Sequence, residues 1–177
     1  VNEAGVAVAY HGGDHGYNDQ LAAWGEAGEV ESFRATPLKA VMLGNRAPYD
    51  HMAALVCHGL FRRFPNLRVA SIEMGTNWVP WLLQSFRRAY GQTPTAFAES
   101  PIDSFRRHIW VAPFHEDDVM LLRDLVGAER LLLGSDYPHA EGLANPASYV
   151  HELKDFSDEE VRLVMRDNAL ALSRRRP

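Results

Sequence analysis

The sequence has very little cysteine and no long apolar run. Cys57 is the only cysteine among 177 residues, so no intrachain disulfide can form and a zinc site built from several cysteines is excluded. A single cysteine is compatible with a reducing compartment, and we expect a cytoplasmic protein. No apolar stretch approaches the roughly 20 residues that span a bilayer, so we expect no membrane segment.

The sequence also lacks a concentrated basic region. The formal net charge is −5, and the arginine pairs are scattered along the chain, which argues against a nucleic-acid-binding face. With 46% hydrophobic and 23% charged residues, the composition is that of an ordinary globular protein. We predict one domain over residues 1–177. Because the chain opens on Val1 shortly before an apolar run, we expect it to be part of a longer protein.

Four short apolar runs predict buried strands. They show little alternation of apolar and polar residues, which is typical of strands covered on both faces in a parallel sheet. The runs are 5–10, 67–72, 108–114 and 130–134.

Helical patterns fill the segments between these runs. A capping box at Ser157 to Glu160 predicts a helix from Asp158 onward. Residues 12–48 are long for a loop and contain aromatic residues, which predicts an ordered active-site insertion. The alternation of strands and helices indicates an α/β fold with right-handed parallel crossovers. The other helical patterns cover 49–64, 78–90, 116–126 and 146–155.

A side chain that can bind metal or transfer a proton follows each apolar run. These residues are His11, Glu73, His115 and Asp136. In a parallel barrel the catalytic groups collect at the carboxyl ends of the strands, which all open onto one face. Asp136 is the strongest candidate, because the turn that follows it brings His139 nearby. A carboxylate with imidazole forms the mixed oxygen and nitrogen site that is typical of catalytic zinc.

Each of these residues also has a structural interpretation. His11 precedes two glycines and is compatible with a surface turn, whereas Glu73 is compatible with a cap at a helix N-terminus. A capping or loop role for His115 is as plausible as a catalytic one. His15, between Asp14 and Gly16, is interpreted as a contact with substrate or solvent rather than as a metal ligand.

Two stretches of sequence have a recognisable arrangement. One is Gly134-Ser135-Asp136-Tyr137-Pro138-His139, followed later by Arg166-Asp167-Asn168-Ala169. The other is Phe64-Pro65-Asn66-Leu67-Arg68-Val69, which runs into Glu73 and Trp78-Val79-Pro80. They resemble the amidohydrolase-related family that includes aminocarboxymuconate-semialdehyde decarboxylase. The resemblance implies a distorted TIM (β/α)8 barrel, of which this chain holds strands five to eight, the C-terminal half.

The resemblance also implies roles for three strand-end residues. It assigns His11 and Asp136 as ligands of a divalent metal, zinc or manganese. The family usually has a histidine where this chain has Glu73, which keeps proton transfer possible but changes charge and basicity. The family's His-x-His or Glu-x-His pair on its first strand is absent from this sequence. Because a catalytic zinc site normally uses three protein ligands, we expect the chain alone to be catalytically incomplete.

Two functional hypotheses follow. The first is a metal-dependent hydrolase or decarboxylase for a small carboxylated or aromatic substrate, with the missing barrel half supplied from elsewhere. Asp136 and Glu73 would then be catalytic, and His15, Trp78 and His139 would contact the substrate. The second is a non-catalytic half-barrel that pairs with a copy of itself. A doubly wound binding module has little support, because no Gly-x-Gly-x-x-Gly turn follows the first strand.

Overall fold

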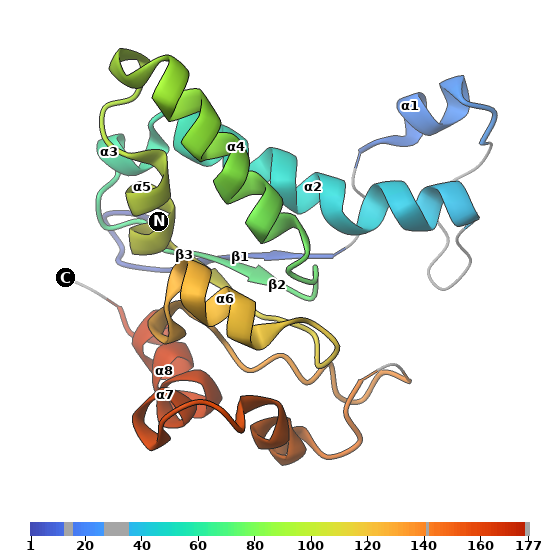
Figure 1. Ribbon diagram of the computed structural model, residues 1–177, viewed down its shortest axis with the longest axis vertical. Coiled ribbons are helices and arrows are strands. Elements are labelled where there is room, and N and C mark those ends of the chain that lie inside the picture. The colour runs from blue at the N-terminus through green and yellow to red at the C-terminus, as the bar shows by residue number, and fades with distance from the viewer. Residues whose placement is uncertain (13–15, 27–35, 141, 176–177) are drawn as a thin grey trace.

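The strands form one parallel sheet. A computed structural model describes residues 1–12, 16–26, 36–140 and 142–175. Strands β1 (Val8–His11), β2 (Val69–Ile72) and β3 (Ile109–Val111) lie side by side in that order. All pairs are parallel, and the arrows of β1 and β2 in Figure 1 point away from the two chain termini. The predicted α/β fold with parallel strands is confirmed.

The fourth predicted strand is wrong in extent. Residues 130–134 contribute one parallel bridge, between Val111 and Leu131. The N–H of Leu132 donates to the carbonyl of Val111 at 2.9 Å, but the N–H of the next residue donates to Val164 instead. The chain therefore leaves the sheet for the C-terminal helical region after a single pairing.

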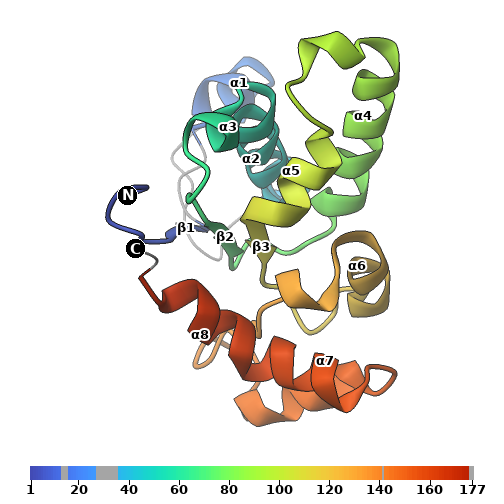
Figure 2. The same ribbon diagram turned by 90° about the vertical axis from the view of Figure 1, so that its left-hand side faces the viewer.

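Helices lie on two sides of the sheet. Helices α2 (Pro37–Cys57), α4 (Trp78–Gln92), α5 (Pro101–His108) and α6 (Val119–Val126) pack against one face, whereas α8 (Asn168–Ser173) contributes Leu172 to the other face (Figures 1 and 2). The shorter segments are α1 (Asn18–Ala23), α3 (Leu60–Arg63), η1 (Pro94–Ala96), η2 (Ala128–Arg130), η3 (Pro146–Leu153), α7 (Asp158–Arg162) and the π-helical η4 (Leu163–Asp167).

Helix α2 begins earlier than the sequence pattern predicted. Thr36 caps it by accepting a hydrogen bond from the N–H of Lys39, and a proline occupies the first helical position. The helix ends before Gly59, which has a φ of 65° and separates α2 from α3. The predicted insertion over 12–48 thus contains α1 and the first half of α2. Its residues 13–15 and 27–35 lie outside the described residues.

The C-terminal helix confirms its predicted start. Ser157 accepts a hydrogen bond from the N–H of Glu160, whose side chain accepts one from the N–H of Ser157. This reciprocal pair is the capping box read from the sequence. Helix α5 was not predicted, and it occupies residues that directly precede β3.

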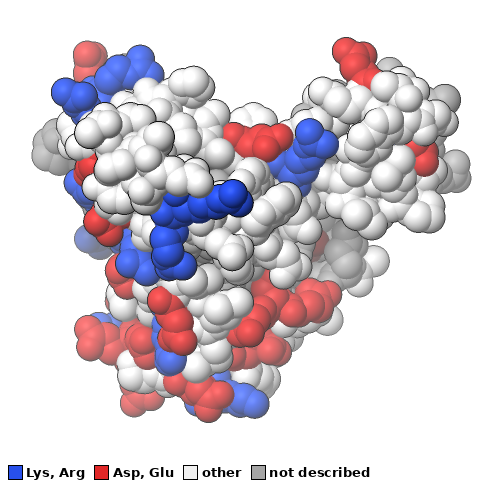
Figure 3. Space-filling model, turned by 45° about the horizontal axis from the view of Figure 1, so that its top comes forward, with Lys and Arg blue, Asp and Glu red and all other residues white. Residues whose placement is uncertain are grey.

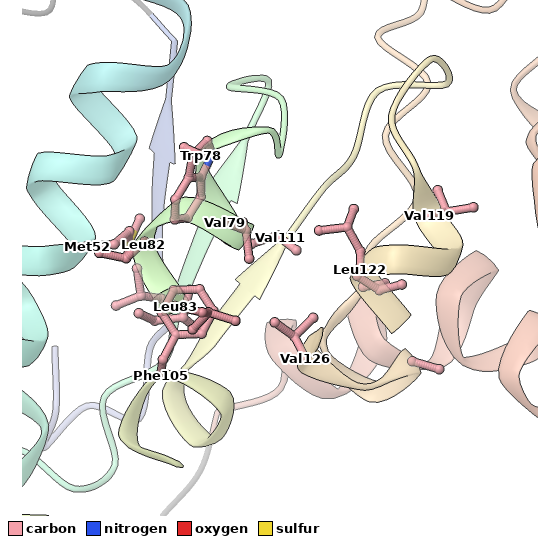
Figure 4. Close-up of a cluster of buried hydrophobic side chains, with 14 of the residues drawn as sticks. Met52, Trp78, Val79, Leu82, Leu83, Phe105, Val111, Val119, Leu122 and Val126 are labelled. Atoms are coloured by element: carbon pink, nitrogen blue, oxygen red, sulfur yellow. The ribbon is translucent and has the colours of Figure 1, made fainter. Parts of the chain in front are cut away.

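The main core fills the space between the sheet and its helices. In Figure 4, Trp78 and Leu82 of α4 lie near Phe105 of α5. Leu122 of α6 belongs to the same cluster. The rings of Trp78 and Phe105 meet edge to face at a centroid distance of 6.2 Å. A smaller cluster covers the opposite face of the sheet, as expected when successive side chains alternate; it contains Ala70, Trp110, Ala112 and Leu132.

Arg68, just before β2, connects both ends of the described chain to the sheet. Its side chain is only 2% exposed. The guanidinium donates to the carbonyl of Gly5 at 2.6 Å and to that of Arg174 at 2.8 Å. It also donates to Ala171 and Leu172, whose carbonyls lie in the last turn of α8 and lack partners within the helix.

Charges of both signs are distributed over the face of the molecule shown in Figure 3. Among the described residues, none of the helices combines the length and apolar character needed to cross a membrane.

Candidate metal and catalytic site

Three predicted site residues meet at the carboxyl ends of the strands. His11 is the last residue of β1, Glu73 follows β2, and Asp136 follows the bridge at Leu131. All three line one cavity of about 290 Å³. The parallel sheet therefore brings together residues that are far apart in sequence. The remaining lining residues are Ile72, Ala112, Phe114, Leu133, Gly134, Ser135 and Tyr137.

His11 forms an ion pair with Glu73. Its Nε2 lies 2.5 Å from Oε2 of Glu73, and its Nδ1 donates to the carbonyl of Gly12 at 2.6 Å. The hydrogen bond to Gly12 raises the pKa of His11 most, burial opposes this, and the charges of Glu73 and Asp136 raise it further. Both ring nitrogens face acceptors, so this geometry favours the imidazolium. The side chain is nevertheless 61% exposed.

Glu73, Asp136 and His139 form a second grouping, which we call the carboxylate cluster. His139 Nδ1 lies 2.9 Å from Oδ1 of Asp136 and 3.6 Å from Oε1 of Glu73. One donor atom from each of the three residues lies within 4.8 Å of the others. The structure thus places His139 beside Asp136, as the sequence predicted, and also beside Glu73, which the sequence did not predict.

The two acidic residues of this cluster have an uncommon backbone conformation. Glu73 has a φ of 53° and Asp136 a φ of 52°, in the left-handed region that residues other than glycine seldom adopt. Such conformations cost about 1–3 kcal/mol each and persist where the surroundings enforce them, often at functional sites. Glu73 directly follows β2, and Asp136 lies in the loop after the bridge at Leu131.

Two glycines allow the backbone to close around these two residues. A Cβ at Gly12 would lie 2.8 Å from the carbonyl oxygen of Glu73, and a Cβ at Gly142 would lie 2.8 Å from that of Ser135 and even closer to that of Asp136. Leu143 then donates its N–H to the carbonyl of Ser135 at 2.8 Å. Side chains at either glycine would therefore displace the residues that carry the carboxylates.

The other predicted residues lie in different surroundings. His115 lines a neighbouring cavity of about 250 Å³ together with Glu73 and Asp136, and its Nδ1 lies 3.3 Å from a carboxylate oxygen of Glu116. Trp78, expected to contact substrate, is instead 0% exposed and donates its indole N–H to the carbonyl of Gly75. It supports the loop from within the core, since no face of its ring is open. His15 lies outside the described residues.

The carboxylate cluster has a donor set that suits a divalent cation. Two carboxylates held this close repel each other, and a cation between them relieves that repulsion. Carboxylate oxygens with imidazole nitrogens are the donors that manganese and zinc accept in proteins. His11 contacts Glu73 but does not belong to this mutually close set. The residues present therefore fit a metal at these strand ends.

Sequence reasoning did not predict the close backbone approach at Gly142 or the contacts of Asp117. The close approach at Gly142 depends on how the loop folds back, and no local pattern signals it. Asp117 accepts hydrogen bonds at two strand-end loops. Its only local signal was a carboxylate shortly before a helix, which is a common capping arrangement.

These features define an α/β protein with a cluster of histidine and carboxylate groups at the carboxyl ends of parallel strands. A sequence model of the amidohydrolase family matches residues 1–175. The chain belongs to this family, as the resemblance predicted.

Solved structures and a curated protein are similar to this chain to different degrees. A crystal structure of an amidohydrolase from Mycobacterium avium subsp. paratuberculosis is 43% identical, with a TM-score of 0.87 over 97% of this chain. A dihydroxybenzoic acid decarboxylase from Polaromonas, solved with bound manganese and the inhibitor 2-nitroresorcinol, shares the fold with a TM-score of 0.66 over 93% of this chain at 17% identity. The 2-amino-3-carboxymuconate-6-semialdehyde decarboxylase of Dictyostelium discoideum is 28% identical over 67% of this chain.

The chain spans less than half the length of each of these three proteins. It covers 43% of the Mycobacterium protein, 48% of the Polaromonas protein and 34% of the Dictyostelium protein.

Proposed function

We propose that this chain provides part of the active site of a metal-dependent hydrolase or decarboxylase that acts on a small carboxylated or aromatic substrate. The observation that carries the proposal is the carboxylate cluster, with His11 beside it, at the carboxyl ends of parallel strands. We further propose that the strands correspond to strands five to eight of a barrel. The chain's coverage of roughly half of its barrel-type relatives supports this.

Asp136 and His11 are the proposed metal ligands. Asp136 is held in place by its left-handed backbone and by His139. His11 offers Nε2, which becomes a ligand only after its proton leaves, because metals bind the neutral imidazole. A divalent ion at these residues, zinc or manganese, supplies Lewis acidity. Manganese is supported by the two carboxylates of the cluster and by the Polaromonas structure, which contains it.

Glu73 is the proposed proton-transfer group. Its two carboxylate oxygens face different imidazoles, Oε2 facing His11 and Oε1 facing His139. A carboxylate in such a position can accept a proton and pass it on to a neighbouring base. Phe114 and Tyr137 line the same cavity and offer apolar ring surface to an aromatic substrate. We propose that His139 contacts the substrate from the edge of this cavity.

Metal content with Asp136→Asn tests the proposal. The matched control is Asp124→Asn on the exposed surface of α6, where the carboxylate pairs only with the adjacent Arg123 among the described contacts. We expect near-stoichiometric manganese or zinc in the wild type and in the control, measured by elemental analysis after dialysis. Asp136→Asn should bind at least about 10-fold more weakly. Equal metal content in all three proteins would overturn the assignment.

A second candidate is a non-catalytic half-barrel that associates with itself. The open edge of β1 favours it, because residues along β1 alternate between half-buried and exposed, whereas β3 is buried throughout. An apolar groove of about 320 Å³ lies beside this edge, lined among others by Val8, Tyr10 and Phe64. Analytical ultracentrifugation distinguishes the two functions, since a stable metal-free dimer supports self-association and contradicts an enzymatic role for this chain.

A further inference from the structure

Asp117, in the loop between β3 and α6, connects two strand-end loops. Its Oδ2 accepts a hydrogen bond from Oγ1 of Thr76 at 2.8 Å and another from the N–H of Phe114 at 2.9 Å. Thr76 is only 2% exposed and follows Glu73 by three residues in the loop after β2. One carboxylate oxygen therefore joins the loop that carries Glu73 to the loop that follows β3.

Packing around this oxygen leaves the loop after β2 little freedom. A Cβ at Gly75 would lie 3.2 Å from the ring of Phe114, so the two loops are in close contact there. The carbonyl of Gly75 accepts the indole N–H of the buried Trp78 at 2.9 Å. The backbone between Glu73 and α4 is thus held from two sides, by Trp78 and by Asp117.

Tyr149 is a further group that interacts electrostatically with Asp117. This residue belongs to η3, which follows the loop that carries Asp136. Its hydroxyl is buried and has no hydrogen-bond partner among the described residues. Burial raises the pKa of Tyr149, and the negative charge of Asp117 raises it further. The phenol therefore lies within the electrostatic reach of Asp117.

We propose that Asp117 is a positioning residue for the metal and catalytic site, and that its Oδ2 fixes the loop of Glu73 relative to the loop that follows β3. This inference rests on the proposed function. Asp117 does not line the cavity of about 290 Å³, so it acts through Thr76 and Phe114 rather than on a substrate. Outer groups of this kind set the orientation of residues at a metal, and their removal commonly weakens metal binding.

Substitutions can distinguish the role of the Asp117 Oδ2 atom as a hydrogen-bond acceptor from the role of the negative charge of Asp117. Both bonds end on Oδ2, so Asp117→Asn can keep them through its amide oxygen, whereas Asp117→Ala removes both. Thr76→Ser keeps the donor hydroxyl, and Thr76→Val removes it at nearly constant volume. We expect Asp117→Asn and Thr76→Ser to resemble the wild type. Asp117→Ala and Thr76→Val should weaken manganese binding by about 10- to 100-fold.

A control variant distinguishes positioning from general destabilisation. Leu122 lies in the core of α6, 2% exposed, and Leu122→Ala lowers stability without touching either loop. Leu122→Ala should retain wild-type manganese affinity even if its melting temperature falls as much as that of Asp117→Ala. Cobalt(II) substituted for manganese gives an absorption spectrum that reports ligand geometry. That spectrum should change in Asp117→Ala and stay unchanged in Leu122→Ala.

Amide hydrogen exchange makes the inference independent of the proposed function. In Asp117→Ala, residues 73–78 and 114–118 should exchange faster than in the wild type and in Asp117→Asn. If the wild type binds no manganese, the proposed function fails and this exchange pattern alone decides the role of Asp117. Wild-type manganese affinity in Asp117→Ala, or unchanged exchange in both loops, would overturn the positioning role.

Discussion

Glu73 and Asp136 have nearly the same backbone conformation, with φ of 53° and 52°, although neither is glycine. Glu73 directly follows β2 and Asp136 lies beyond the bridge at Leu131, and donor atoms of the two residues fall within 4.8 Å of one another. Two strained residues with like charges therefore face each other. The fold bears a cost of about 1–3 kcal/mol at each position to hold this arrangement, which is expected of a site that favours function over stability.

Glu73→Gly should stabilise the metal-free protein. Glycine adopts a positive φ without steric cost, and the substitution removes one of two facing carboxylates. We expect the free energy of unfolding to rise by up to about 1 kcal/mol, because relief of strain is partly offset by loss of the ion pair with His11 and by the greater freedom of glycine when unfolded. Urea denaturation measures this. Glu73→Ala is the matched control, which removes the charge but keeps the strain, and equal stability of the two variants would contradict the strain.

Metal binding should strengthen as the pH rises through the pKa of His11. The pKa lies above its ordinary value of 6.5, chiefly because of the hydrogen bond to Gly12, and a proton on Nε2 competes with the metal. Manganese titrations between about pH 5.5 and 8.5 should show an affinity that rises until His11 is neutral. This range extends roughly one to two pH units on either side of the ordinary histidine pKa. In His11→Gln the dependence should flatten, and an unchanged slope would argue against His11 as a ligand.

Stability of the metal-free protein should change in the opposite sense. Because the folded-state pKa of His11 exceeds the unfolded value, the ion pair with Glu73 stabilises the fold fully below about pH 6.5. This contribution disappears as the pH rises through the folded-state pKa. The effect is small, since His11 is mostly exposed. Thermal unfolding at pH 5.5 and 8.5 should show a difference that His11→Gln removes.

Arg68→Met should destabilise the whole domain. Four carbonyl groups, on Gly5, Ala171, Leu172 and Arg174, lose a charged donor in a buried place. We expect a loss of at least about 3 kcal/mol, since hydrogen bonds to charged groups contribute roughly 1.5–3 kcal/mol each.

Two further substitutions test this account of Arg68. Arg68→Lys should recover little of the loss, because an ammonium cannot reproduce the planar fork of donors. Arg62→Met, on the exposed surface, should change stability by no more than about 0.5 kcal/mol. Urea midpoints that fall equally in Arg62→Met and Arg68→Met would contradict the buried role of Arg68.

Gly142→Ala should weaken the metal site, whereas Gly44→Ala should not. A Cβ at Gly142 would collide with the backbone oxygens of Asp136 and Ser135, but nothing lies within 4 Å of a Cβ at Gly44. Gly44 lies inside α2, where alanine is favoured over glycine by about 0.8–1.0 kcal/mol. Calorimetric titrations should therefore show weaker manganese binding in Gly142→Ala and unchanged binding in Gly44→Ala, and thermal unfolding should show a gain of stability in Gly44→Ala. Equal affinities would show that Asp136 tolerates the displaced loop.

Local sequence signals predicted the parts of the fold that depend on local interactions. The capping box at Ser157 and the apolar runs of β1 to β3 are examples, and the structure confirms them. Helix α2 was placed too late, because Pro48 lies inside it and interior prolines usually end helices. Helix α5 was missed because it is only eight residues long and leads straight into β3.

The sequence predicted which residues gather at the site but not all of the contacts between their side chains. Because these residues follow apolar runs, His11, Glu73 and Asp136 were expected on one face, and the structure brings them to one cavity. Their roles as ligands and catalytic groups stay predictions. The contact of His139 with Glu73 and the positive φ values depend on loop conformations. No periodicity or spacing encodes these loop conformations, which become visible only in the three-dimensional structure.

The guanidinium of Arg68 also has a practical consequence for protein engineering. It holds residues 5 and 174 through hydrogen bonds of 2.6 and 2.8 Å, so the described segments around these two residues lie close together (Figure 2). A short flexible linker could join them, and new ends could be opened in the exposed segment from Gly91 to Ala96. Such a circular permutant would keep every strand-end residue in place while allowing a fusion partner to enter beside η1, between two helices.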